Sequence, residues 1–316
     1  MKEKKEHNNK TTLAILAFVG VGLIVVFVVV MLFLVTLFNS DSPGSLSTGN
    51  VAIIEVNGII QTQTPNSVLG GDVASSNEIR SYIEKAANDR TVKAVLIKVN
   101  SQGGSPVATD EIASAIKSTN KTTVAVIRDV GASGGYWIAS ACDQIFANKM
   151  SLVGSIGVTS AHLGFDEFIK EHNVSYRRLV SGEHKDIGSP FKEMTQEEKK
   201  IFQKKLDVLH EIFIQEVKEN RDMDEEQIKK VSTGLFWTGL EAKELDLIDK
   251  FGGEKDAITF IEKEQGISAN KIKYTKQPSF TDILMGAVQN HAFSMGEGIG
   301  SSIAQESKPE PHSILV

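Results

Sequence analysis

Residues 122–142 read TTVAVIRDVGASGGYWIASAC and contain one complete transition from strand to helix. Thr122–Arg128 is rich in β-branched residues, which is typical of a strand, and Ser133–Cys142 has the composition of a packed helix. Glycines at 131, 134 and 135 allow a tight turn between the two. Because parallel sheets are assembled from such strand and helix pairs, the stretch predicts a βαβ unit.

The same alternation continues on both sides of this stretch. Val51–Ile60 and Ala94–Asn100 are further strand patterns, and Asn77–Asn88 and Thr109–Ser118 have helical spacing. Thr195–Glu219 starts with a capping-box pattern and predicts a long helix. The other predicted strands are Gln144–Asn148, Leu152–Thr159, Tyr176–Val180 and Ile272–Tyr274, and the other predicted helices are Phe165–Glu171, Asp224–Lys230, Gly239–Leu245 and Asp256–Glu264. The chain is therefore expected to be an α/β protein with a largely parallel sheet.

An uncharged apolar run precedes the α/β part of the chain. Residues 13–38 exceed the roughly 20 residues that a helix needs to cross a bilayer, and we predict one transmembrane anchor. A cleaved signal peptide is the alternative, but its apolar region is usually about 7–15 residues long. Lysines at positions 2, 4, 5 and 10 precede the run and the next basic residue is Arg80, so residues 1–12 are expected in the cytoplasm. The protein is then a single-pass cell-membrane protein whose main domain is extracytoplasmic.

Composition defines the rest of the domain organisation. Residues 39–50 are rich in Ser and Gly and predict a flexible linker, 51–276 form the folded domain, and 277–316 form a tail that is mobile or docked. The net charge of −6 offers no basic patch for nucleic acid. Cys142 is the only cysteine, so no intrachain disulfide forms, and its apolar neighbours indicate a core residue. The sequence contains no metal-ligand cluster or phosphate-loop pattern, and we expect no cofactor and no metal.

Two glycine-containing stretches follow predicted strands and carry the candidate chemistry. In Asn100–Pro106 (NSQGGSP), Gly103 and Gly104 allow backbone N–H groups to approach a ligand, as an oxyanion hole requires. Ser133 is expected at the strand-to-helix turn, where the helix N-terminus favours developing negative charge. Taken alone, Ser133 is explained more simply as a helix-capping serine.

The combination of six stretches resembles the signal peptide peptidase A family, serine peptidases of the Clp-protease/crotonase-like βαβ superhelical fold. The stretches are VAIIEVNG (51–58), NSQGGSP (100–106), GASGGY (131–136), LVGSIGV (152–158), SGEHKDIGSPFKEMT (181–195) and FWTGLEAKELDLIDKFGG (236–253). Together they cover about residues 51–253, and none is specific by itself. The sequence departs from the family at Gln102, where proline is frequent, and at Asp246, where glycine is common. Both departures affect the shape of a loop and leave the proposed chemistry intact.

The resemblance implies a role for each candidate residue. Ser133 would be the nucleophile, Lys185 the general base, and Ser155 the residue that orients the lysine. The oxyanion donors would be the N–H groups of Gly134 and of one glycine in the 103–104 pair. A lysine at its reference pKa of about 10.4 is protonated at neutral pH and serves as a base only when it is desolvated.

The resemblance also implies partners for the protein. Family members assemble into homo-oligomers, in which Ser133 and Lys185 would come from neighbouring subunits because this chain has one short peptidase unit. The implied substrates are cleaved signal peptides and similar apolar peptides. The reaction would be endopeptidase hydrolysis at the membrane.

Several other interpretations remain open from the sequence. A histidine could replace the lysine as base, and His162 is better placed for this role than His172 or His184. The chain could also be a membrane-tethered scaffold that retains a peptidase fold without activity. An acyl-CoA enzyme is disfavoured outside the cytoplasm. A membrane protease that clips stomatin-like partners is disfavoured because no second apolar run of spanning length occurs.

Overall fold

The computed structural model describes residues 22–31, 49–63 and 72–275. Residues Thr48–Thr275 belong to one compact unit, and residues 22–31 are helical. Among the described residues, no helix has both the length and the apolar character needed to span a bilayer. Most of the anchor predicted at 13–38 lies outside the described residues, as do the predicted N-terminal tail, most of the linker and the C-terminal tail.

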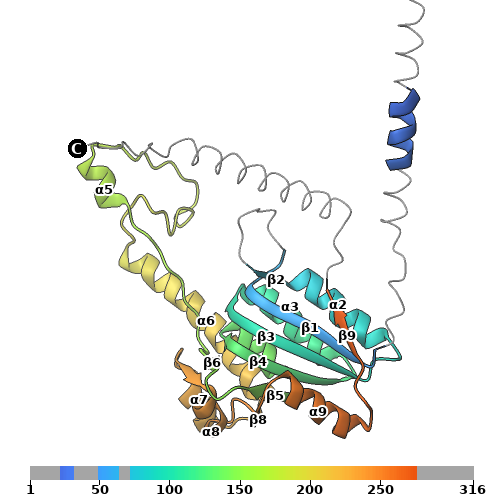
Figure 1. The fold of residues 1–316 in the computed structure, drawn as a ribbon. Helices are drawn as coiled ribbons and strands as arrows, with labels where there is room; N and C mark the ends of the chain where they lie inside the picture. The colour runs from blue at the N-terminus through green and yellow to red at the C-terminus, as the bar shows by residue number, and fades with distance from the viewer. Residues whose placement is uncertain (1–21, 32–48, 64–71, 276–316) are drawn as a thin grey trace, which may run out of the picture. The chain divides into compact units, whose positions relative to one another are not determined.

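A largely parallel sheet forms the centre of the compact unit (Figure 1). Its central strands are β1 (Val51–Gln61), β3 (Ala94–Gly104), β4 (Thr122–Ala132) and β5 (Gln144–Ala147), which neighbour one another in that order. The shorter strands are β2 (Val73–Ser75) and β9 (Lys271–Tyr274) beside β1, β8 (Lys250–Phe251) beside β5, β6 (Leu152–Gly154) beside β4, and β7 (Phe236–Thr238) beside β6. Only the β6–β7 pair is antiparallel among the pairs of described strands. The predicted α/β class and largely parallel sheet are confirmed.

Two apolar clusters bury the two faces of this sheet. The helices are α2 (Ser76–Asn88), α3 (Pro106–Ser118), α4 (Gly134–Ser140), α5 (Asp166–Glu171), α6 (Gln196–Asn220), α7 (Glu225–Val231), α8 (Gly239–Glu244) and α9 (Glu254–Gln265). On β3, Ile97 belongs to the larger cluster with α2, α3 and α4, whereas Leu96 belongs to a smaller cluster with α9. Successive strand residues face opposite sides, so burial on both faces explains the nearly continuous apolar runs that marked the strands.

The short strands β2, β7 and β8 were not predicted from the sequence, and β3 and β4 extend beyond their predicted ends at Asn100 and Arg128. The predictions also differ from the structure at residues 176–180, at residue 155 and at the start of α3. Among the described residues, Tyr176–Val180 pairs with no strand and all five residues are exposed, so this strand prediction is wrong. Its sequence YRRLV is β-prone but has two central arginines and no sheet edge beside it. The strand predicted at Leu152–Thr159 ends at Gly154, because Ser155 has φ 51 and turns the chain. Helix α3 begins earlier than predicted, since Ser105 caps it by accepting a bond from the Ala108 N–H.

The segment between the sheet and α6 has no core of its own. Residues 159–195, here called the arm, include α5, and none of these described residues is buried. Helix α5 lies away from the sheet, beyond the N-terminal end of α6 (Figure 1). The predicted capping box of α6 is confirmed, because the Glu198 N–H donates to Thr195 Oγ1 at 3.1 Å and the Thr195 N–H donates to Glu198 Oε2 at 2.9 Å. The arm therefore enters α6 at a well-defined helix start.

Candidate active site

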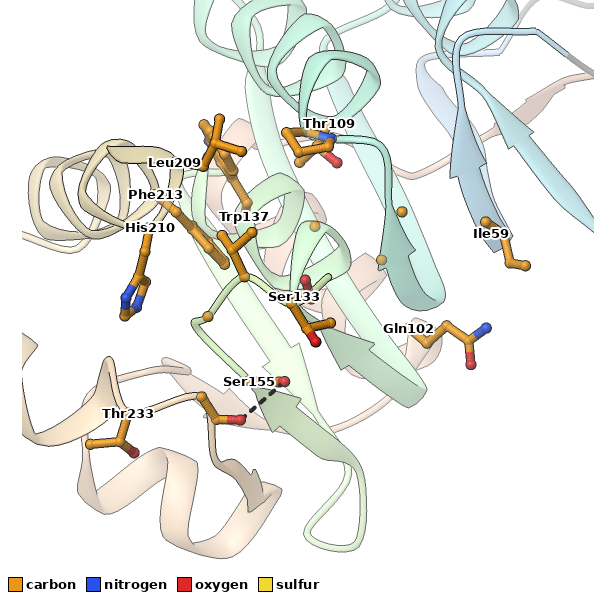
Figure 2. Close-up of a pocket in the computed structure, with 18 residues that line it drawn as sticks. Ile59, Gln102, Thr109, Ser133, Trp137, Ser155, Leu209, His210, Phe213 and Thr233 are labelled. Carbon is orange, nitrogen blue, oxygen red and sulfur yellow. Dashed lines mark hydrogen bonds between the residues drawn. The ribbon is translucent and has the colours of Figure 1, made fainter. Parts of the chain in front are cut away.

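A cavity of 690 Å³ lies at the carboxyl ends of strands β3, β4 and β6 (Figure 2). Its lining includes five of the six residues that the sequence nominated: Gly103, Gly104, Ser133, Gly134 and Ser155. The strands that carry them run parallel, so their carboxyl ends meet at one edge of the sheet. The structure thus brings together residues as far apart in the chain as Gly103 and Ser155.

Ser133 has an unusual backbone conformation at the end of β4. Its φ is 52° and its ψ is −126°, in a region that residues with a side chain rarely adopt. The Ser133 N–H donates to the Gly154 carbonyl at 2.8 Å, which ties β4 to β6. Ser133 occupies the N-cap position of α4, as the helix-cap interpretation predicted, but within the described part of the chain its side chain makes no capping bond, so capping does not explain the residue. A strained residue costs of order 1–3 kcal/mol, and such residues cluster at functional sites.

The glycines around Ser133 are required by close approach of the backbone. Gly103 has φ 102°, and a Cβ there would lie 2.8 Å from the Gly134 nitrogen and 2.9 Å from the Ser133 Cβ. A Cβ at Gly134 would lie 2.4 Å from Thr109 Oγ1, and one at Gly104 would lie 2.0 Å from a backbone oxygen. The Gly103 N–H donates to a side chain of its own strand, Ser101 Oγ, at 3.0 Å. Gly103 therefore packs directly against Ser133 and Gly134, which brings the first glycine stretch into contact with the second.

Ser155 faces the same cavity from the end of β6. It too has a positive φ, of 51°. Its N–H donates to the Leu235 carbonyl at 2.8 Å, and its Oγ donates to the Gly234 carbonyl at 3.3 Å (Figure 2). The segment around residue 234 thus holds Ser155 in place beside Ser133.

Lys185, the sixth nominated residue, lies elsewhere. It is exposed on the arm, and it is absent from the described residues that line the cavity. Its backbone N–H donates to the Gly182 carbonyl at 3.1 Å within a turn. One chain by itself therefore does not bring Lys185 to Ser133.

A network of ion pairs lies next to Lys185. Arg178 donates to both carboxylate oxygens of Asp186, from Nε at 2.6 Å and from Nη2 at 2.9 Å. Lys192 lies 3.4 Å from the Asp186 carboxylate and also pairs with Glu198. The Arg178 guanidinium is the main cause that lowers the pKa of the Asp186 carboxyl to about 2. The pKa of Glu198 is also lowered. The hydrogen bond from Lys192 is the larger cause, and the one from the Thr195 backbone N–H is the next.

One histidine that the sequence did not single out lies in the cavity wall. His210 projects from α6, and its Nε2 lies 3.2 Å from the Ile156 carbonyl (Figure 2). A carbonyl only accepts, so this nitrogen carries the proton. His162, His172 and His184 are exposed and lie outside the described lining, so the structure brings none of them to Ser133. The sequence offered one indication of this position, because His210 lies at helical spacing from the apolar residues of Thr195–Glu219. Its distance from Ser133 in sequence gave no reason to place the two together.

The rest of the cavity wall is largely apolar. Leu209 and Phe213 come from α6, and Trp137 comes from α4. The rings of Trp137 and Phe213 stack with centroids 5.0 Å apart. Among the described lining residues, His210 is the only histidine, and no lysine, arginine, aspartate or glutamate is present. The described lining thus offers two serines, one histidine and apolar side chains.

Comparison with known proteins gives a consistent result. The profile of peptidase family S49 matches residues 115–268, which include Ser133, Ser155 and Lys185. A protein of Methanocaldococcus jannaschii whose name describes a protease is 31% identical over 223 residues, covering 70% of this chain and 71% of its own length. A protein of Enterococcus faecium named as a signal peptide peptidase is 29% identical over 232 residues, covering 72% of this chain and 67% of its own. The chloroplastic serine protease of Arabidopsis thaliana is 29% identical over 225 residues, 70% of this chain and 33% of that protein.

The mostly parallel α/β fold, the serine cavity and these relatives define a peptidase. The chain belongs to the signal peptide peptidase A family, peptidase family S49. The resemblance inferred from the six stretches is thereby confirmed.

Proposed function

We propose that the protein is a membrane-bound serine endopeptidase that degrades cleaved signal peptides and similar apolar peptides, with Ser133 as nucleophile and Lys185 as general base. The observation that carries the proposal is the strained Ser133, held at the edge of a cavity against Gly103 and Gly134. A mostly parallel sheet with the serine at a strand-to-helix turn also fits the Clp-protease/crotonase-like fold that we propose for the domain.

The proposed reaction is acyl transfer followed by hydrolysis. The neutral amine of Lys185 accepts the Ser133 proton as Oγ attacks the peptide carbonyl. The resulting ammonium then donates this proton to the leaving nitrogen as the C–N bond breaks, which leaves the acyl group on Ser133. Negative charge on the carbonyl oxygen would be stabilised by the N–H of Gly134 and by one N–H of the 103–104 pair. In this pair, the Gly103 N–H already donates to Ser101 Oγ. We therefore favour the Gly104 N–H as the second oxyanion donor. Water then releases the acyl group from Ser133.

The second part of the proposal is that Lys185 reaches Ser133 from a neighbouring subunit. Lys185 is exposed and outside its own chain's cavity, which supports a shared site. The arm and α6 also expose large apolar side chains, including Leu179 at 95% and Leu163 at 74%, which a homo-oligomer would bury. Burial of the amine in such an interface would favour its neutral form.

The apolar cavity wall supports an apolar substrate. Leu209, Phe213 and Trp137 offer little for a charged side chain to pair with. The uncharged run at 13–38 and the lysines before it support a single-pass anchor with the peptidase domain outside the cytoplasm. An enzyme anchored there would meet signal peptides left in the membrane after cleavage.

The test of the catalytic pair uses the full-length protein in detergent and a signal-peptide substrate. Ser133→Ala and Lys185→Ala should each abolish hydrolysis, because one removes the nucleophile and the other the base. Exposed residues of the same types supply controls, and Ser160→Ala and Lys229→Ala should retain activity. Activity that persists in Lys185→Ala would rule out the dyad.

The test of the shared site mixes the two inactive variants. In a random equal mixture, about one quarter of the sites would combine an intact Ser133 with an intact Lys185 from the neighbour, so activity should return to about that fraction. Sites built within one subunit would stay inactive in every mixture. The oligomeric state of the detergent-solubilised protein, measured by light scattering, should exceed one in the same samples.

A further inference from the structure

The arm is held together by polar contacts in place of a core. None of the described residues 159–195 is buried, yet the Asp186 side chain is only 12% exposed and that of Glu198 only 6%. The cations around these two acids are Arg178 and Lys192. The most sheltered polar groups of the region are thus gathered in one connected network.

Arg178 binds the chain on both sides of Lys185. Its guanidinium donates to the Asp186 carboxylate through two nitrogens, at 2.6 and 2.9 Å, and to the Glu183 carbonyl at 3.2 Å. Residue 185 lies between these two anchor points, and its N–H closes a turn on the Gly182 carbonyl. A planar guanidinium with three such bonds restricts the orientation of the turn far more than a single contact would.

The same network also occupies the acid nearest in sequence to Lys185. Two cations, Arg178 and Lys192, hold the Asp186 carboxylate. The residue that directly follows Lys185 is therefore fixed by ion pairs within the arm.

We infer that Arg178 and Asp186 are a positioning pair for Lys185, which clamp the turn that presents its amine to Ser133. The inference rests on the proposed function, since it takes Lys185 as the general base. The pair itself touches no substrate. Its role is to deliver the base in one orientation, so its loss should act on turnover more than on substrate binding.

The first experiment compares steady-state kinetics of full-length variants. Arg178→Gln should lower kcat by about 10²-fold with little change in KM, because misplacement of a catalytic group by about 1 Å has this cost. Arg178→Lys should not rescue kcat, since an ammonium cannot reproduce the three-bond fork. Asp186→Asn, which keeps one acceptor for Arg178, should fall between Arg178→Gln and wild type. Arg177→Gln is the matched control, because Arg177 is the exposed neighbouring arginine and should leave kcat unchanged.

The second experiment asks on which side of a shared site Arg178 acts. An Arg178→Gln subunit has an intact Ser133 but a misplaced lysine, so mixing it with Ser133→Ala should raise activity to about one quarter of wild type. Mixing it with Lys185→Ala should give no gain, because neither subunit then presents a positioned lysine. If Arg178 only stabilised the fold, mixing Arg178→Gln with Ser133→Ala or with Lys185→Ala would give the same result.

The outcomes separate this inference from the proposed function. Full activity of Lys185→Ala would overturn the proposed function and the inference with it. If Lys185→Ala is inactive but Arg178→Gln keeps a wild-type kcat, the positioning pair alone is overturned. If Ser133→Ala and Lys185→Ala do not complement each other, the shared site fails. The kinetic comparison of Arg178→Gln, Arg178→Lys and Arg177→Gln then decides the inference, and equal effects of the three variants would contradict it.

Discussion

The serine side of the candidate site and the arm that carries Lys185 are built in opposite ways. Ser133 and Ser155 follow strands whose residues are largely buried, and both are held in strained conformations by backbone bonds to neighbouring segments. Lys185 sits on a stretch without a buried residue, stabilised by side-chain ion pairs. Strain can be stored only where the surroundings over-determine the backbone. One chain therefore suffices to shape the surroundings of Ser133, the proposed nucleophile, whereas Lys185, the proposed base, depends on surface polar contacts and, as proposed, on a neighbouring subunit.

The largest effect is expected from a variant that disturbs the packing around Ser133 and leaves the arm unchanged. Gly103→Ala would place a Cβ 2.9 Å from the Ser133 Cβ, at a φ of 102° that alanine rarely adopts. Displacement of Ser133 and of the neighbouring N–H groups should lower kcat by about 10²–10³-fold, as loss of an oxyanion donor does. Steady-state hydrolysis of a signal peptide checks this. Gly253→Ala is the control, since a Cβ there would meet no described atom within 4 Å, and similar losses in both variants would contradict the close-packing argument.

A smaller effect is expected where α6 contacts the segment next to Ser155. His210→Ala removes the bond from Nε2 to the Ile156 carbonyl, next to Ser155. A hydrogen bond of this kind contributes about 1 kcal/mol, so kcat should fall by up to about fivefold. His210→Gln can place an amide N–H near the same carbonyl and should recover part of the loss. A Gln variant no better than Ala would show that the bond is unimportant.

The smallest effect concerns acid sensitivity of the arm. Asp186 has a pKa lowered from 3.8 to about 2, with Arg178 as the main cause, so its ion pairs stabilise the folded arm above pH 3.8 and are lost as the pH falls through 2. Amide hydrogen exchange across this pH window should show local opening of the arm before the sheet opens, after correction for the intrinsic exchange rate. Arg178→Gln should reduce that pH dependence, because among the described residues only the Lys192 contact with Asp186 then remains. Equal protection changes in arm and sheet would contradict the contrast.

Much of the fold was predictable because its signals are local. The β-branched runs of β1, β3 and β4 marked buried parallel strands, and the Thr195 capping box marked the start of α6. Ser133 and its glycines were identified from turn chemistry and from the family resemblance. The strand expected at Tyr176–Val180 failed for the same reason that the others succeeded, since a β-prone pattern forms a strand only where another edge pairs with it.

The sequence by itself determined the α/β class and the glycine-flanked serine, and it predicted the anchor and the role of Lys185. Only the tertiary structure decided that Gly103 packs on Ser133, that His210 reaches the Ile156 carbonyl, and that Lys185 stands apart on the arm. The physical reason is the range of the interactions. Propensity, capping and turn chemistry act over a few residues and are readable in order along the chain. Contacts between strand ends and a distant helix depend on sheet register and packing, which no short stretch encodes.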